Sequence, residues 1–271
     1  MFLIVLFSHS ICERRQPTLL KQIFEDDDVV AYKPRDDLWL LQTKQGIPVS
    51  IYVLEGTEKA LVIDCDHIIK NFKDLIQKVT KKPFVLALSH GHIGHVGSIN
   101  EFETIYMNKK DQNLIPNYKG KIEDIHHGYK FDLGDREIEV FDMEGHTEGS
   151  IGFLDKKGKF IVAGDAIGHN VIWMHITKVP LESLIGTLQY LISIKDQWTE
   201  LYTGHFNEPN RPLDLRFVED LLELTQKICY TKDYKAEPYE AHGFKLDFQP
   251  MIAYGNNGVG IIFNPNRLHY V

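Results

Sequence analysis

Hydrophobic positions along the chain follow two different periods, and the change of period separates strands from helices. Between residues 28 and 56 short apolar runs alternate with turn-forming residues, which is typical of a meandering antiparallel sheet. Over residues 67–79 the apolar side chains instead lie three to four positions apart, which predicts an amphipathic helix. Two more helical patterns follow Pro180 and Pro212, and we expect these prolines to open the helices because proline is favoured at the first helical position.

The remaining apolar runs predict strands at residues 83–88, 137–141, 151–154, 160–163 and 200–202, and a hairpin of residues 251–254 and 259–263. Two strand-rich blocks, each followed by helices, indicate two sheets packed face to face with helices outside. The chain shows no long internal repeat and no Gly/Ser-rich or Pro-rich linker. We therefore expect one domain over residues 28–271, preceded by a tail or short leader at residues 1–27.

Residues 2–7 form a short apolar run at the N-terminus. A secretory signal has an apolar core of roughly 7–15 residues after a basic segment, and a membrane-spanning helix needs about 20. The run meets neither requirement, so we predict a loosely docked tail on a cytoplasmic protein. The alternative is secretion through an atypically short signal, with cleavage near Cys12.

Charge and cysteine content narrow the class of protein. The formal net charge is −8, which argues against a general nucleic-acid binder because phosphate contacts need clustered Lys and Arg. The three cysteines, Cys12, Cys65 and Cys229, are too few and too far apart for a disulfide framework or a Cys-rich zinc module. We expect a small-molecule substrate and neither a nucleic-acid nor a membrane partner; the sequence does not determine the oligomeric state.

Histidines gather directly after the strand predicted at residues 83–88. His90 and His92 face the same way on an extended segment and can reach one metal ion, whereas His95 turns away from them. His146, Asp165 and His205 each follow a later strand-like run. Side chains that converge from several strand ends are a common way to build a metal site on a rigid scaffold.

At these residues the chain resembles the metallo-β-lactamase superfamily, whose signature is His-x-His-x-Asp-His followed by a His, an Asp and a His from later strands. The resemblance covers roughly residues 28–263, through the histidine cluster and through Gly-His-Thr-x-Gly-Ser, Gly-Asp and Gly-His around His146, Asp165 and His205. Gly94 stands where the signature has its aspartate. The resemblance implies an α+β fold, the αββα sandwich of two mixed sheets flanked by helices, with metals at one end of the sheets.

The matched residues imply zinc-dependent hydrolysis. His90, His92 and His146 make the principal site, where zinc lowers the pKa of bound water to about 7 and supplies a metal-bound hydroxide for attack on an ester, thioester or lactone. The second set is His95, Asp165 and His205. The counterpart of Asp165 bridges two metals in the family, and Asp165 is the candidate catalytic residue that orients the water.

Gly94 removes one carboxylate from the second set, and three outcomes follow. Asp66, Cys65 or Glu148 replaces the missing ligand, or the second site binds metal weakly with extra waters, or a single metal leaves Asp165 free as a general base. We expect two ions with a weaker second site; zinc is expected, with manganese and iron as alternatives.

Two other hypotheses of function compete with the hydrolase. A metal-binding protein without efficient turnover, used for ligand or partner recognition, is motivated by Gly94, and a phosphodiesterase is the other alternative. Asp64 is expected to orient a ligand or the histidine loop. His169 and His175 lie in a loop expected at residues 168–175, which forms either a wall of the substrate site or a packed connection.

Overall fold

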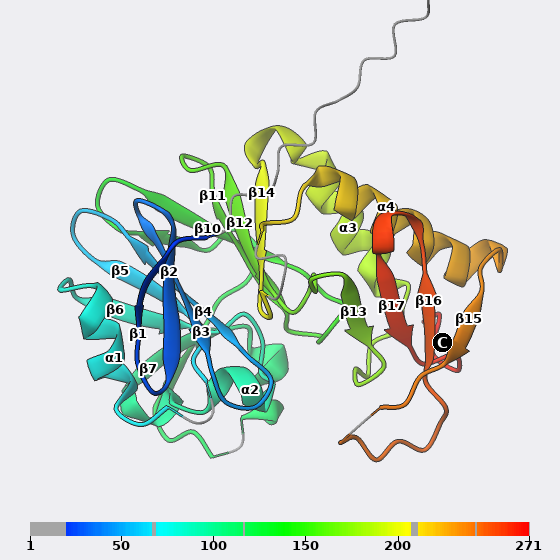
Figure 1. Ribbon diagram of the computed structural model, residues 1–271, viewed down its shortest axis with the longest axis horizontal. Coiled ribbons are helices and arrows are strands. Elements are labelled where there is room, and N and C mark those ends of the chain that lie inside the picture. The colour runs from blue at the N-terminus through cyan, green and yellow to red at the C-terminus, as the bar shows by residue number, and fades with distance from the viewer. Residues whose placement is uncertain (1–19, 67–68, 116, 207–210, 242, 271) are drawn as a thin grey trace, which may run out of the picture.

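The computed structural model describes residues 20–66, 69–115, 117–206, 211–241 and 243–270 (Figure 1). The short apolar run and most of the expected tail, with its cleavage site near Cys12, lie outside the described residues. Strand β1 (Gln22–Glu25) pairs antiparallel with the next strand, so the first sheet starts a few residues before position 28.

The first sheet has eight strands in sequential order. Its first five strands form an antiparallel meander, and the last four of the eight are parallel to one another. The remaining strands are β2 (Val29–Arg35), β3 (Leu38–Thr43), β4 (Ser50–Glu55), β5 (Ala60–Ile63), β6 (Phe84–Ala87), β7 (Thr104–Met107) and β8 (Lys121–Asp124). Helix α1 (Phe72–Val79) connects β5 to β6, and the one-turn helix α2 (Ile93–Val96) follows β6.

The second sheet has five strands in the order β14-β12-β11-β10-β9. They are β9 (Lys130–Asp132), β10 (Glu137–Asp142), β11 (Ile151–Asp155), β12 (Phe160–Gly164) and β14 (Glu200–Thr203), and only β12 and β14 pair in parallel. One buried cluster joins Leu40 and Tyr52 of the first sheet to Val140 and Phe153 of the second, so the two sheets pack face to face.

Helices cover the outer faces of both sheets. Phe72 and Ile76 of α1 pack on the first sheet, whereas α3 (Ser183–Ser193) and α4 (Leu215–Gln226) belong to a cluster that includes Leu154 of the second. The predicted αββα sandwich of mixed sheets is confirmed. Short helical turns occupy η1 (Ile99–Glu101), η2 (Lys109–Leu114), η3 (Lys195–Gln197), η4 (Lys227–Thr231) and η5 (Asn256–Gly258).

A third sheet stands beside the sandwich, under α3 and α4 in the view of Figure 1. It is ordered β13-β17-β16-β15 and consists of β13 (Val171–Met174), β15 (Ala236–Pro238), β16 (Met251–Tyr254) and β17 (Gly260–Phe263). The predicted β16–β17 hairpin is confirmed. The prediction of a loop over residues 168–175 is wrong for Val171–Met174, because β13 pairs in parallel with β17, far away in the sequence.

The predicted helix openings at Pro180 and Pro212 are wrong by a few residues. Helix α4 begins after Asp214, whose carboxylate accepts a hydrogen bond from the Phe217 N–H at 3.1 Å and so satisfies an otherwise free donor. Pro180 lies in a turn before α3, where its carbonyl accepts from Ser183. Among the described helices none is long and apolar enough to cross a bilayer.

Candidate metal centre

Asp64, at the end of β5, holds the segment that leaves the neighbouring strand β6. Its Oδ1 accepts a hydrogen bond from the Ser89 N–H at 2.7 Å, and its Oδ2 accepts from the Ser89 hydroxyl at 2.7 Å. The same Oδ2 lies 3.0 Å from Nδ1 of His95. Parallel pairing of β5 with β6 brings the two strand ends together. The expectation that Asp64 orients the histidine loop is confirmed by these contacts.

Asp111, on the turn η2, ties the histidine loop to the loop that carries His146. Its Oδ2 accepts hydrogen bonds from the Gly91 N–H at 2.9 Å and the Thr147 hydroxyl at 2.7 Å, and its Oδ1 accepts from the Gly149 N–H at 2.9 Å. A Cβ at Gly149 would stand 2.7 Å from Cγ of Asp111, so a glycine is required for this close approach.

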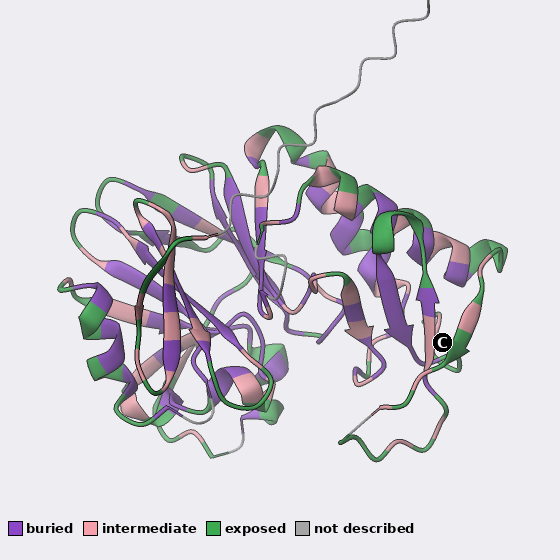
Figure 2. Cartoon of the chain, viewed as in Figure 1, coloured by how far each residue is buried: buried purple, intermediate pink, exposed green. Residues whose placement is uncertain are grey.

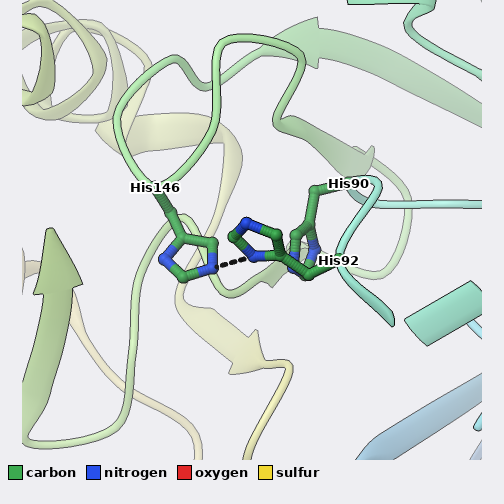
Figure 3. A group of neighbouring side chains, drawn as sticks. All are labelled: His90, His92 and His146. Atoms are coloured by element: carbon green, nitrogen blue, oxygen red, sulfur yellow. Dashed lines mark hydrogen bonds between the residues drawn. The ribbon is translucent and has the colours of Figure 1, made fainter. Parts of the chain in front are cut away.

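His90, His92 and His146 form one group whose ring nitrogens lie within 4.8 Å of one another (Figure 3). Nδ1 of His92 is 2.8 Å from Nε2 of His146. The other ring nitrogen of His146 contacts the Trp173 carbonyl at 2.7 Å, and Nδ1 of His90 contacts the Ser89 hydroxyl at 3.0 Å. Each of these two imidazoles, His90 and His146, therefore has one nitrogen held by the protein and one turned to the group.

Asp165 stands between this trio and a second group, formed with His95 and His205. Its Oδ2 lies 3.1 Å from Nε2 of His205 and 3.4 Å from Nε2 of His95. It is also 3.6 Å from Nε2 of His146 and 3.9 Å from Nε2 of His90. One carboxylate oxygen thus faces four imidazoles that come from three separate segments of the chain.

The donor atoms of the two groups fit a divalent metal ion. Nε2 of His90, Nε2 of His95 and Oδ1 of Asp165 are buried without a hydrogen-bond partner among the described residues. Buried polar atoms in proteins are rarely left unpaired, because each such group loses its interaction with water. Imidazole nitrogens with a carboxylate oxygen are the ligand types that zinc accepts.

The chain is similar in sequence and in fold to known proteins. Human acyl-coenzyme A thioesterase MBLAC2 is 20% identical over 214 residues, which cover 60% of this chain and 75% of that protein. A hydroxyacylglutathione hydrolase from Bdellovibrio bacteriovorus is 26% identical over 131 residues, 44% of this chain and 48% of that protein. A metallo-beta-lactamase from Pontibacter korlensis superposes with a TM-score of 0.60 at 17% identity, over 72% of this chain and 98% of its own.

The chain has a metallo-β-lactamase-like fold. A metallo-beta-lactamase family protein from Thermus thermophilus also superposes, with a TM-score of 0.58 at 14% identity over 76% of this chain and 85% of that one. No protein-family model matches the sequence.

Burial and neighbouring charges set the protonation states of residues in the two ligand groups. Burial lowers the pKa of His92 and lowers that of His146 to about 3, which keeps both rings neutral and their lone pairs available. At His95 burial opposes the charge, but the carboxylates of Asp165 and Asp64 outweigh it and raise the pKa to about 10. Burial likewise opposes the charge of Asp165, and the imidazoles of His205 and His95 nevertheless hold its pKa well below the usual value.

The three residues expected from the sequence to stand in for an aspartate at position 94 belong to none of the ligand groups among the described residues. Glu148 is exposed, and Sγ of Cys65 donates to the His95 carbonyl at 3.3 Å. Asp66 is buried but is absent from the described ligand groups. A Cβ built on Gly94 would meet only Cγ2 of Val49, at 3.7 Å, so packing does not require glycine there.

A pocket of about 120 Å³ opens beside the cluster. It is lined by Ile47, His146, Asp165, Gly168, His169, Val171, Trp173 and His205. The structure places His169 in this wall, as one of the two sequence interpretations has it, whereas His175 is buried behind it among the rings of Trp173, Tyr239 and Phe244.

Six residues that the sequence predicted as ligands lie together in the structure, and further residues that were not predicted hold their side chains in place. His90, His92, His95, His146, Asp165 and His205 all lie in the ligand groups. The missed contacts are the carboxylate of Asp111 and the carbonyls of Trp173 and Pro48, the last of which is 2.6 Å from Nδ1 of His205. Backbone carbonyls leave no signature in a sequence, and Asp111 belongs to no recognisable motif.

Proposed function

We propose that this protein is a metal-dependent hydrolase that cleaves an ester-type bond, preferentially a thioester. The observation that carries the proposal is the position of Asp165, whose Oδ2 lies within 3.1–3.9 Å of four imidazole nitrogens. His90, His92 and His146 would hold a principal zinc ion, and His95, Asp165 and His205 a second one. Zinc at such a site acidifies water to a pKa of about 7 and polarises a carbonyl oxygen.

The protein's own residues would position the reactants. Oδ1 of Asp165 has no partner among the described residues and would accept a hydrogen bond from the attacking water. Asp64 and Asp111 would fix the loops that carry the histidines, so the imidazoles need no rearrangement during the reaction. The acyl carbon would lie in the pocket beside His146 and His205.

The preference for a thioester is supported by the relatives. One is a human acyl-coenzyme A thioesterase and another a hydroxyacylglutathione hydrolase, and both names denote transfer of an acyl group from sulfur to water. We infer the same bond type for this chain: water adds to the acyl carbon, the carbon–sulfur bond breaks, and the products are a carboxylic acid and a thiol.

We further propose that Gly94 takes the place of the superfamily aspartate and weakens the second metal site. Loss of a carboxylate removes one negative charge beside a dication. Asp66, Cys65 and Glu148 join none of the ligand groups among the described residues, although Asp64 lies in a group with His90 and His95. The same feature favours the second candidate function, a metal-binding protein without efficient turnover.

The deciding experiment measures zinc content and hydrolysis on the same preparations. Wild type, His146→Ala and the control His126→Ala, an exposed histidine outside the cluster, are assayed with a panel of thioesters, esters, lactones and phosphodiesters. We expect zinc in wild type and control, turnover of thioesters, and a loss of more than about a hundredfold in His146→Ala, which exceeds the loss expected from a merely supporting residue. Zinc binding without turnover across the panel would establish the binding function instead, and a protein that stays free of zinc would reject both.

A further inference from the structure

Strand β13 presents alternate residues to the candidate active site and to the core. Ile172 and Met174 are buried in the cluster that contains α3 and α4. Val171 and Trp173 are only half-buried and line the pocket beside the metal ligands. Side chains alternate across a strand, which puts Val171 and Trp173 on one side of β13. His169, in the turn before this strand, lines the pocket as well.

This face is fixed by the third sheet, outside the αββα sandwich. Val171 pairs with Gly260 and Trp173 with Ile262 of β17, a strand that is buried along its length (Figure 2). The Trp173 ring is also braced by Phe244, with ring centroids 6.3 Å apart and nearly perpendicular planes. At the same time, the Trp173 carbonyl contacts His146 at 2.7 Å. The apolar wall and a candidate metal ligand are therefore held by one residue.

The volume of the pocket limits what can lie on this wall. A cavity of about 150 Å³ holds one benzene ring, so the space of about 120 Å³ beside the cluster accepts fewer carbons than that. Part of the space is needed for the carbonyl and the attacking water. Ile47, Val171 and Trp173 line the pocket, so an apolar group of a few carbons would lie among them and a longer chain would meet the indole of Trp173.

We propose that β13 sets the chain length of the acyl group, with Trp173 as the residue that closes the pocket to long chains and Val171 as the floor beneath short ones. The inference rests on the proposed hydrolase function and names its substrate class: thioesters of short, apolar acyl groups of roughly butanoyl size, below the volume of benzene. The wall is built by the third sheet, outside the sandwich.

The first test compares thioesters of N-acetylcysteamine that carry acetyl, butanoyl, octanoyl and dodecanoyl groups. In wild type we expect kcat/KM to rise from acetyl to butanoyl and to fall by at least about tenfold at octanoyl, because an overpacked pocket is destabilising. Trp173→Ala should raise the ratio of kcat/KM for the octanoyl thioester to that for the butanoyl thioester by at least about tenfold. Val171→Phe, which places a larger side chain in the pocket, should make the acetyl thioester the preferred substrate. Trp39→Ala, which removes an indole on β3 outside the pocket, should keep the wild-type profile.

A second test measures binding without turnover, on metal-free protein, by calorimetry with S-ethyl, S-butyl and S-octyl thioethers of N-acetylcysteamine. Each methylene that enters the pocket should tighten binding about fourfold, so affinity should rise from ethyl to butyl and then stop rising at octyl. Trp173→Ala should restore the gain at octyl. If Trp173→Ala folds poorly, Trp173→Phe and Val171→Phe replace it in the test, because they change the volume of the pocket by less.

The two tests separate the pocket from the chemistry. If affinity stops rising at the butyl thioether and no thioester is hydrolysed, the proposed function is rejected and the chain-length proposal is retained. Two outcomes in wild type would contradict the chain-length proposal alone. One is hydrolysis with kcat/KM that rises through the dodecanoyl thioester, and the other is an octyl thioether that binds as tightly as its extra methylenes allow. No binding and no hydrolysis would overturn both.

Discussion

The Asp111 carboxylate lies 2.7 Å from the hydroxyl of Thr147, the residue directly after His146. The same oxygen accepts from the Gly91 N–H, between His90 and His92. Asp111 is 2% exposed and lies on the turn η2, which follows strand β7 of the first sheet. Thr147 follows strand β10 of the second sheet. One carboxylate thus holds together the two loops that supply the principal histidine trio.

Replacing that carboxylate should loosen the trio. Asp111→Asn keeps the size of the side chain but turns an NH₂ group toward N–H donors, so at least one of its three hydrogen bonds is lost. We expect zinc affinity to fall by about 10–100-fold, the usual effect of removing a partner that orients a ligand. Zinc competition with a chromogenic chelator measures it. Asp124→Asn, an exposed acceptor of the Lys109 N–H on the same turn, is the control, and equal effects of the two variants would remove Asp111 from this role.

Adding a carboxylate at position 94 should strengthen the proposed second metal site. Gly94 has helical backbone geometry in α2, and an added Cβ meets only Val49 at an ordinary distance. A negative charge a few ångströms from a dication is worth a few kcal/mol in a partly solvated site, so Gly94→Asp should bind the second zinc equivalent at least about tenfold more tightly. Equilibrium dialysis followed by metal analysis gives the stoichiometry.

The control for this substitution is Gly186→Asp, which adds the same charge on the exposed side of α3, where an added Cβ meets nothing. An equal gain in both variants would assign the effect to net charge. If wild type already holds two zinc ions tightly, the weak second site is contradicted.

Metal removal should lower thermal stability. The cluster gathers five imidazoles and a carboxylate, and three of their polar atoms are buried without partners among the described residues. A ligand present at a hundred times its Kd stabilises the native state by about 2.7 kcal/mol, which corresponds to roughly 5–10 °C in Tm for a chain of this size. Calorimetric scans with zinc and with EDTA test this expectation. In the His146→Ala, His205→Ala double variant the difference should vanish, and an unchanged difference would place the stabilising metal elsewhere.

A buried ion pair distant from the cluster should govern stability without affecting metal binding. Arg136, 5% exposed, donates to the fully buried Asp155 and to the carbonyls of Asp37 and Glu55 at 3.0 and 2.8 Å. Arg136→Met would leave Asp155 charged, buried and without its cation, at a cost of about 3–5 kcal/mol in the free energy of unfolding. Urea denaturation measures the loss. Lys130→Met, which removes an exposed pair with Glu137, should cost less than about 1 kcal/mol, and similar losses in both would contradict the argument.

The parts of the fold that were predicted from the sequence depend on local patterns. The helical period of α1 and the alternation in the β16–β17 hairpin involve neighbouring residues, so their signals survive in a single sequence. The ligand groups were found because the six residues come shortly after apolar strands and carry distinctive side chains.

The parts that were missed depend on contacts between distant segments. Strand β13 has four residues and becomes a strand through pairing with β17, which the chain reaches only after two more helices. Asp111 acts through two glycine N–H groups and a threonine hydroxyl, none of which marks a partner in a sequence. Helix α4 starts after Asp214 rather than at Pro212, because the Asp214 carboxylate accepts a hydrogen bond from the Phe217 N–H and so caps the first turn.

The parallel pairing of β13 with β17 has a consequence for how the protein is made. Every residue of the two ligand groups has left the ribosome once the chain has grown some way past His205, whereas the strand that braces Trp173 is synthesised later. A nascent chain can therefore gather its imidazoles before β17 is available to pair with β13 and brace Trp173.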